Sequence, residues 1–439
     1  MAYVIFGIGY FLLQSLLIAG TRINVFPEMF FLPWLVSKGL LPYRDFFDHH
    51  GFLLYYMLAP LTIERSLVFI KLFYFFTQSL NLFLVLMILK KVSSRSGFLL
   101  GGLLFVFMNF FVSDNVIWYD TFITAFFLSS FLLFYSKTKY KHHLSGLFIT
   151  LASFIKPVAG IMILPVVFFS RTIIPFGWII GGWFVVGFFF AINHGLTQLI
   201  DQLFFFNRFL VQYYRNPFFS DQKFLISVSI MVLLSVVILA FSGKLKKILL
   251  TFSFLFLSIV FVFYLYNKQH LIELSAFSVI LIGQTMKDVK KWGRIFFVII
   301  ILFCVIMGRK AFFQRTYLNH YQQAWIENTE TAKIISSLRK NHLDTKRIFV
   351  FGRHVEIYYM LNLLPPTKYP LLFPLIENYD PNLEIKLING LRDNNIGTIV
   401  VPLPLDKQFK TLSKVINYIH QDYIASIKNK DFEVFIKRK

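Results

Sequence analysis

Long apolar runs separated by short polar connections fill the first 309 residues and then stop. A membrane-spanning helix needs about 20 apolar residues, and this pattern predicts eleven such helices. They are residues 3–20, 66–89, 97–112, 116–135, 144–155, 157–170, 174–192, 224–242, 247–266, 271–286 and 295–309. Lys156-Pro157 leaves open whether residues 144–170 form one kinked helix or two short ones. The first run lacks a charged leading segment and a small-residue cleavage site, so we do not interpret it as a removable signal peptide.

Residues 310–439 follow a different pattern, with short apolar stretches between polar, amphipathic segments. The pattern predicts strands at 347–352, 397–401, 422–427 and 432–437, and helices at 354–362, 382–394 and 411–420. Gly352 is followed by no glycine-rich phosphate-binding motif, so a plain strand-to-helix turn is expected there. We therefore predict an all-α polytopic membrane domain over 1–309 and a small extracytoplasmic α/β domain over 310–439.

The composition supports a membrane protein. The chain is 57% hydrophobic and 15% charged, against about 45–50% and about 25% in soluble proteins. These values argue against a disordered chain, a nucleic-acid module or a simple soluble enzyme. The net charge of +22 therefore indicates a lipid bilayer as partner and no nucleic acid. The single cysteine, Cys304, lies in an apolar run and has no second cysteine to pair with.

Basic residues in the short loops set the expected orientation, because they favour the cytoplasmic side. If the chain reverses at Lys156, four basic loops fall on one side, at 90–95, 137–141, 244–247 and 287–294. The N-terminus is then cytoplasmic and the C-terminal domain extracytoplasmic. Nine of the ten acidic residues among the first 309 then lie at the outer face, and Asp288 is the exception. Any carboxylate chemistry is therefore expected outside the cytoplasm.

The first outer loop, residues 21–65, is too long for a simple connection. Pro27 suits the first position of a helix running to about Lys38, and Gly39 suits its end. This helix has an aromatic face and is expected to lie flat at the membrane interface. The face is formed by Phe30, Phe31, Trp34 and Leu35.

The same loop contains the residues most suited to chemistry. Its acidic and imidazole side chains are Glu28, Asp45, Asp48, His49 and His50. A carboxylate near a low-dielectric surface can act as a general base toward a hydroxyl group. Alternatives remain open, since Glu28 also suits a helix N-terminus, Asp45 an N-cap or a pair with Arg44, and the histidines an interface. Asp45, Asp48 and His49 have plausible ligand types, but their spacing matches no strong metal signature. We therefore predict no metal or other cofactor and leave a divalent cation open.

The segment Phe26-Pro27-Glu28, the following helix and Gly39-x-x-Pro42-Tyr43-Arg44-Asp45-Phe46-Phe47 resemble the opening of the GT-C glycosyltransferases of family 39. This is the dolichyl-phosphate-mannose–protein mannosyltransferase-like group, and the chain resembles a divergent bacterial member. Residues 145–157 are similar to the family's Gly-Leu-Ala…Lys helix pair, and residues 267–270 stand at its short basic outer loop. Two features depart from the family pattern. One acid replaces the usual Asp-Glu pair at Glu28, and His50-Gly51-Phe52 replaces Pro-Pro-Leu.

The resemblance implies a GT-C fold and inverting transfer of a sugar from a polyprenyl-phosphate donor to a glycan, lipid or protein hydroxyl. Glu28 is the first candidate for the base and Asp45 the second, with Asp48 beside them. Lys156 is the first candidate for holding the donor phosphate, because a cation in an apolar run needs a polar partner. Further candidates for donor or substrate binding are Arg44, His49, His50, Lys268, His270, Arg208 and Arg215.

Each of these cations has a plainer interpretation, namely a lysine that reaches the interface or an aromatic-basic anchor. The same holds for Asp114, Asn115, Trp118, Tyr119 and Asp120 in the second outer loop. Two other functions stay open: a non-catalytic envelope-glycan assembly protein and a flippase or transporter of lipid-linked sugars. The expected location is the bacterial cytoplasmic membrane.

Overall fold

The computed structural model describes residues 2–19, 23–112, 115–213, 245–264, 270–286, 329–341, 343, 346–352, 354–372, 374–402, 412–428 and 432–438. The chain divides into two compact units. The first, here called the bundle unit, comprises Met1–Asn24, Lys71–Gly187 and Tyr214–Tyr321. The second, the α/β unit, comprises Val25–Ile70, Phe188–Tyr213 and Gln322–Lys439.

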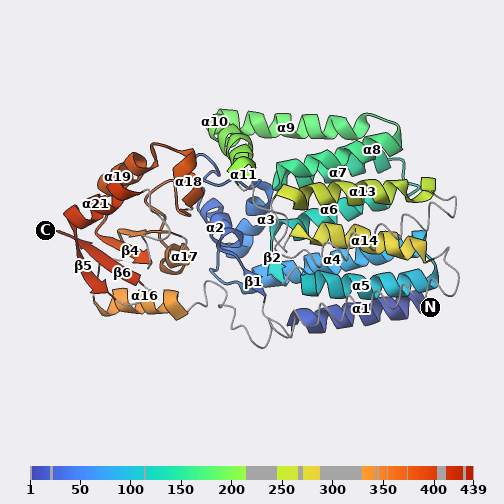
Figure 1. The fold of residues 1–439 in the computed structure, drawn as a ribbon, viewed down its shortest axis with the longest axis horizontal. Coiled ribbons are helices and arrows are strands. Elements are labelled where there is room, and N and C mark those ends of the chain that lie inside the picture. Colours follow the sequence, from blue (N-terminus) through green and yellow to red (C-terminus); the bar gives the residue numbers. More distant parts are fainter. Residues whose placement is uncertain are drawn as a thin grey trace. The chain divides into compact units, whose positions relative to one another are not determined.

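The bundle unit consists of apolar helices that lie side by side along a common direction (Figure 1). They are α1 (Ala2–Ala19), α4 (Val68–Val92), α5 (Arg95–Val112), α6 (Tyr119–Leu133), α7 (Lys141–Ile155), α8 (Ile163–Ser170), α9 (Ile174–Ile192), α13 (Leu245–Tyr264) and α14 (Ile272–Thr285), with the short strand β2 (Val116–Ile117) before α6. Glycines allow the closest approach, since a Cβ on Gly97 would lie 2.3 Å from the carbonyl oxygen of Gly283.

Each expected span within the described residues contains helix, while 224–242 and 295–309 lie outside them. Among the described residues, α4 and α9 are long and apolar enough to cross a membrane by length and composition. The other apolar helical stretches found there measure 10–17 residues, among them Tyr3–Ala19, Arg95–Phe110 and Ile248–Ile259. The count of eleven spans therefore stays a prediction.

The chain reverses direction at Lys156. Pro157 disfavours helical geometry in the residue before it, and Lys156 is extended, with φ −148° and ψ 109°. A 3-10 helix, η2 (Pro157–Met162), then leads into α8. A Cβ on Gly146 of α7 would touch Pro175 of α9, and a Cβ on Gly182 of α9 would touch Thr150 of α7. Because both contacts advance in the same direction along the two helices, α7 and α9 are parallel. The chain therefore returns through α8, and residues 144–170 form two short segments.

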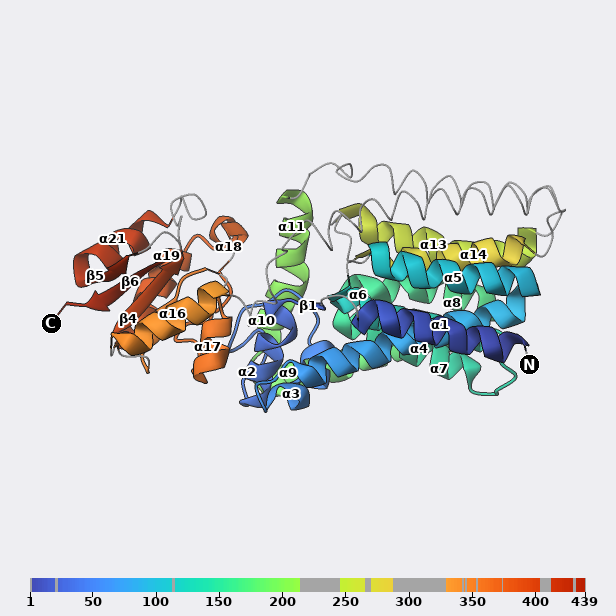
Figure 2. The same ribbon diagram turned by 90° about the horizontal axis from the view of Figure 1, so that it is seen from below.

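The α/β unit contains a four-stranded sheet in the order β3-β4-β6-β5. Its strands are β3 (Ile348–Val350), β4 (Thr398–Pro402), β5 (Tyr423–Lys428) and β6 (Phe432–Lys437). Strands β3 and β4 are parallel, and the other neighbours are antiparallel. Helices α19 (Leu383–Asp393) and α21 (Ser413–Asp422) lie on one face, and α16 (Thr329–Lys340) on the other (Figures 1 and 2). Two further helices are α17 (Glu356–Leu361) and α18 (Pro374–Tyr379). The four strands and helices α17, α19 and α21 lie where the sequence pattern predicts them, whereas the pattern did not predict α16 and α18.

Two earlier stretches of the chain belong to the same unit. The first carries β1 (Asn24–Val25), the 3-10 helix η1 (Pro27–Met29), α2 (Phe31–Ser37) and α3 (Leu53–Thr62). The second carries α10 (Leu196–Ile200), a π-helical turn η3 (Asp201–Phe206) and α11 (Asn207–Tyr213). Phe47, Phe206 and Leu210 from these stretches join Phe349 and Ile399 in one buried cluster. The core of the α/β unit is therefore assembled from three distant parts of the sequence.

The aromatic face of α2 corrects one prediction. Pro27 begins η1, and Gly39, with φ +85°, follows α2 as the sequence predicts. However, Phe30 and Trp34 are fully buried, with ring centroids 5.1 and 5.7 Å from Tyr359 of α17. The prediction that this face lies flat at the membrane interface is wrong, because protein covers it. Packing against tyrosine removes these rings from water, as contact with lipid would.

Candidate functional site

A buried charged cluster lies where helix ends meet in the bundle unit. Asp120 is in the first turn of α6 and Glu273 in the first turn of α14. Both carboxylates therefore face the positive end of a helix dipole. His270 lies just before α14, and Lys156 stands at the break after α7. Segments far apart in the sequence thus bring two acidic and two basic side chains together.

Asp120 is the centre of this cluster. Lys156 Nζ donates to Asp120 Oδ1 at 3.1 Å, and His270 Nδ1 lies 2.8 Å from Oδ2. Lys156 Nζ and His270 Nδ1 are 3.4 Å apart. The carboxyl groups of Glu273 and Asp120 also interact, while Glu273 Oε2 has no hydrogen-bond partner in the described part of the chain. Asp120 and Glu273 are each only 1% exposed. A buried charge needs such a partner, because desolvation of an isolated ion is costly.

The contacts of this cluster explain why a lysine stands within an apolar run at position 156. Its side chain is 18% exposed and held by a carboxylate, which differs from a lysine that only reaches toward water. Two sequence-predicted cations, Lys156 and His270, therefore lie together. Asp120 and Glu273 were not among the site residues predicted from the sequence, where Asp120 was given the plainer interpretation of an interface residue. The signal that could have found them is an acidic residue at the start of an apolar run.

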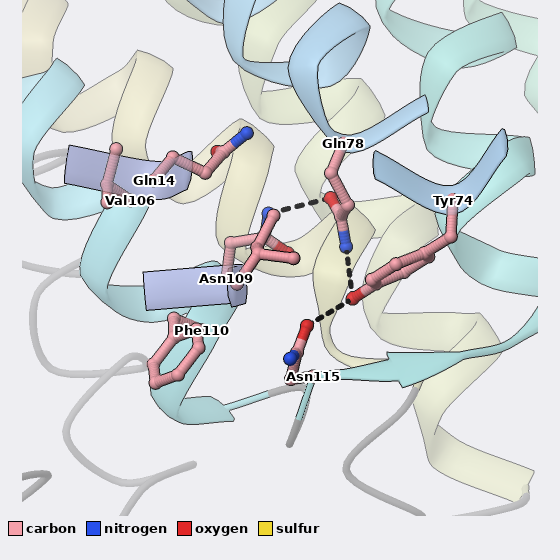
Figure 3. A pocket seen from close by; sticks show the side chains of 8 residues that line it. Gln14, Tyr74, Gln78, Val106, Asn109, Phe110 and Asn115 are labelled. Atoms are coloured by element: carbon pink, nitrogen blue, oxygen red, sulfur yellow. Dashed lines mark hydrogen bonds between the residues drawn. The ribbon is translucent and has the colours of Figure 1, made fainter. Parts of the chain in front are cut away.

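A second, uncharged polar cluster lies between α1, α4 and α5 of the bundle unit (Figure 3). Asn109 Nδ2 donates to Gln78 Oε1, Gln78 Nε2 donates to Tyr74 Oη, and Tyr74 Oη donates to Asn115 Oδ1. Gln14 is buried beside them, and its amide atoms have no hydrogen-bond partner among the described residues. The cavity leaves about 10 Å³ for the centre of a water molecule. That is room for about one water.

In the α/β unit, Asp48 is the centre of the second ionisable cluster. It is 2% exposed. Tyr55 Oη donates to Asp48 Oδ2, which also accepts from the backbone N–H of His50 at 3.0 Å. The other oxygen, Oδ1, lies 3.1 Å from His50 Nδ1 and 3.7 Å from His49 Nδ1. These three side chains hold one carboxylate oxygen and two ring nitrogens within 4.8 Å of one another.

Side chains from elsewhere in the unit fix the backbone around Asp48. Gln202, in the π-helical turn, accepts from Asp48 N at 3.0 Å and donates to Tyr43 O at 2.8 Å. Tyr43 Oη donates to His50 O, and Asn207 Nδ2 donates to His49 O, both at 2.7 Å. Tyr43 adopts φ +67°, which side chains other than glycine rarely do. The loop is therefore held in one conformation by four polar contacts.

The protonation of this cluster follows from its burial. Burial lowers the pKa of His49 to about 3, and His50 adds to the effect, so the His49 ring is neutral at physiological pH. Burial acts to raise the pKa of Asp48, but His50 and the hydrogen bond from Tyr55 outweigh it and hold the pKa below its ordinary value. The cluster thus presents an ionised carboxylate beside a neutral imidazole.

The remaining predicted site residues fall at separate places. Glu28 is buried in η1, at 8% exposure. Asp45 accepts from Leu41 N at 2.7 Å and pairs with Arg44, as the plainer interpretation of that residue expects. The hydrogen bond from Arg44 lowers the pKa of Asp45, and the Arg44 guanidinium also donates to the carbonyl of residue 193. Arg208 is exposed on α11. Lys268, Arg215 and Asp114 lie outside the described residues.

The fold of the chain is similar to that of a solved oligosaccharyltransferase. It superimposes on the crystal structure of the apo oligosaccharyltransferase of Archaeoglobus fulgidus with a TM-score of 0.53 and 12% sequence identity. The match covers 91% of this chain and 70% of that chain. No protein-family model and no curated protein matches the sequence. This likeness concerns the fold alone, and it agrees with the fold that the sequence analysis expects.

Proposed function

We propose that the chain is an inverting membrane glycosyltransferase. It moves a sugar from a polyprenyl-phosphate donor to a hydroxyl group of a glycan, lipid or protein at the outer face of a bacterial cytoplasmic membrane. The observation that carries the proposal is the buried pairing of Lys156 with Asp120 and His270 within a GT-C fold. The predicted phosphate-holding lysine is thus a positioned group.

In this proposal Lys156 holds the donor phosphate. As the bond between the sugar C1 and the phosphate oxygen breaks, negative charge grows on the departing polyprenyl phosphate. A fixed cation stabilises that charge more than it stabilises the bound donor, and so it lowers the barrier. Asp120 holds the Lys156 ammonium in place, and His270 supplies a second nitrogen 3.4 Å from Nζ. The apolar, phenylalanine-rich helices suit the isoprenoid chain.

The acceptor hydroxyl must lose its proton as it attacks C1. We assign this role to Glu28, a carboxylate buried at the start of η1, with Asp45 as the second choice. The ion pair of Asp45 with Arg44 makes it the weaker base, because the pair stabilises the ionised form. Attack on the face opposite the phosphate inverts the configuration at C1, and polyprenyl phosphate leaves with the electron pair.

We also propose that the chain is a member of family 39 and that its N-terminus is cytoplasmic. The Phe-Pro-Glu and Gly-x-x-Pro-Tyr-Arg-Asp-Phe segments support the family, and the basic loops support a cytoplasmic N-terminus. With this orientation the C-terminal domain lies outside the cytoplasm.

The test is sugar transfer by the purified full-length protein in detergent, with a panel of radiolabelled polyprenyl-phosphate sugars. We expect release of polyprenyl phosphate from one donor. Glu28→Gln should abolish release, since loss of a general base typically costs about 10²–10⁴-fold. Lys156→Ala should raise the donor concentration needed and lower turnover. Glu64→Gln and Lys137→Ala, exposed residues of the same charge, serve as matched controls and should keep full activity.

Two results would contradict the assignment. Wild-type turnover in Glu28→Gln removes Glu28 as the base and moves the role to Asp45. Binding of one donor without release by the wild-type protein supports a non-catalytic assembly protein or a flippase instead.

A further inference from the structure

We propose that Asp48, His49 and His50 form a binding site for a divalent transition-metal ion, with Zn²⁺ as the best-suited ion. The site lies wholly within the α/β unit. The inference does not rest on the proposed glycosyl transfer, since it concerns only what these three side chains bind.

The spacing of the three ligand atoms fits one ion. In a tetrahedral zinc site with bonds of about 2.0–2.1 Å, neighbouring ligand atoms are about 3.3 Å apart. Asp48 Oδ1 lies 3.1 Å from His50 Nδ1 and 3.7 Å from His49 Nδ1. The three ligand atoms all lie within 4.8 Å of one another, so side-chain adjustments within the cluster would bring them to bonding distance of one ion.

The carboxylate is already oriented for this role. Tyr55 Oη and the His50 backbone N–H both donate to Asp48 Oδ2, so Oδ1 is the oxygen that faces the two rings. Gln202 fixes the backbone of Asp48, and Asn207 fixes that of His49. Metal sites depend on such outer contacts, because they hold the ligands in place before the ion arrives.

A simple hydrogen-bonded Asp–His pair does not account for His49. That pair needs only Asp48 and His50, yet His49 Nδ1 is buried and has no hydrogen-bond partner among the described residues. A buried polar atom without a partner costs free energy. A metal ion bound to Nδ1 removes that cost.

The donor set indicates the class of ion. Two imidazole nitrogens and one carboxylate oxygen suit Zn²⁺ and its first-row neighbours, whereas Mg²⁺ and Ca²⁺ prefer oxygen ligands alone. Three protein ligands leave a fourth position for water or an oxyanion.

His354 and Glu356 provide an internal control. His354 Nδ1 lies 3.0 Å from Glu356 Oε1, which also accepts from Thr331 Oγ1 at 2.6 Å. This pair matches Asp48 and His50 in distance and burial but has no second histidine beside it among the described residues. It should not bind the ion.

The experiment is a Zn²⁺ titration of the full-length protein, purified without a metal-affinity tag and stripped with a chelator. A chromophoric chelator competes for the ion and reports both stoichiometry and affinity. We expect about one tight site per chain. His49→Gln should weaken it by more than the about 10–100-fold that loss of an outer contact costs. His354→Gln should leave the affinity unchanged.

Several outcomes would overturn the proposal: no tight Zn²⁺ site in the wild-type protein, equal affinity in His49→Gln, or equal weakening in His354→Gln. His50→Gln supplies a second ligand deletion if His49→Gln does not fold, and it keeps a donor toward Asp48. Because the readout is binding of the metal alone, the result is independent of any transferase activity.

Discussion

The two ionisable clusters are built in opposite ways. In the bundle unit, Asp120, Lys156 and His270 come from segments up to 150 residues apart, and each stands at a helix end. In the α/β unit, Asp48, His49 and His50 are consecutive, and distant side chains hold their backbone. The first cluster depends on the helices packing correctly, whereas the second depends on the conformation of one loop. Substitution of one residue of the cluster should therefore lower the free energy of unfolding more in the bundle unit than in the α/β unit.

The largest expected effect is that of Asp120→Asn. It leaves Lys156 and His270 side by side without the carboxylate that joins them. Removing one partner of a buried ion pair costs about 3–5 kcal/mol of unfolding free energy. Thermal unfolding in detergent measures the loss, with the exposed Asp393→Asn as a matched control. Asp120→Asn combined with Lys156→Gln should recover part of it. A loss below about 1 kcal/mol, the value of a surface pair, would mean that the cluster is solvated.

A smaller effect is expected from Tyr55→Phe in the α/β unit. The substitution removes the hydroxyl that donates to Asp48 Oδ2, while the backbone N–H of His50 still donates to it. A hydrogen bond to a charged group contributes about 1.5–3 kcal/mol. Tyr56→Phe, the neighbouring and more exposed tyrosine, should change little in the same unfolding measurement. Equal losses in the two variants would mean that Tyr55 does not orient the carboxylate.

The smallest expected effect depends on pH. Burial and the nearby Glu384 raise the pKa of Glu377 from 4.5 to about 7. Between these values the folded state holds a proton that the unfolded state has lost, so stability falls as the pH rises through this window. Glu377→Gln should therefore unfold at a higher temperature than wild type at pH 8 and at the same temperature at pH 4. Glu377 is partly exposed, so we expect less than about 1 kcal/mol. A pH-independent difference would contradict this origin.

The sequence predicted the elements well because hydrophobic periodicity is a local signal. The helices of the bundle, the break at Lys156 and the strands of the α/β unit lie where the pattern placed them. The environment of α2 could not be predicted in this way. An aromatic helix face at a membrane interface and one buried against Tyr359 have the same composition, and only tertiary packing distinguishes them.

The candidate sites likewise divide into features that are local in the sequence, which could be predicted, and features that depend on tertiary packing, which could not. The residues of the outer loop stood out because acids and histidines are close together in the sequence. His270 and Lys156 stood out singly, but their pairing through Asp120 joins positions 120, 156 and 270 and leaves no trace in any short window. The Gln14, Gln78 and Asn109 cluster was missed for a related reason, since each amide is one polar residue within an apolar run.

The three-part core of the α/β unit has a consequence for synthesis of the chain. Phe47 and Phe349 pack in one cluster but are separated by about 300 residues of sequence. At about 5–20 residues per second, the ribosome delivers the second of them roughly 15–60 s after the first. During that interval Phe30, Phe31 and Trp34 have no α17 to cover them. The aromatic loop must wait in an aqueous or interfacial environment until almost the whole protein has been made, so this unit completes its folding last.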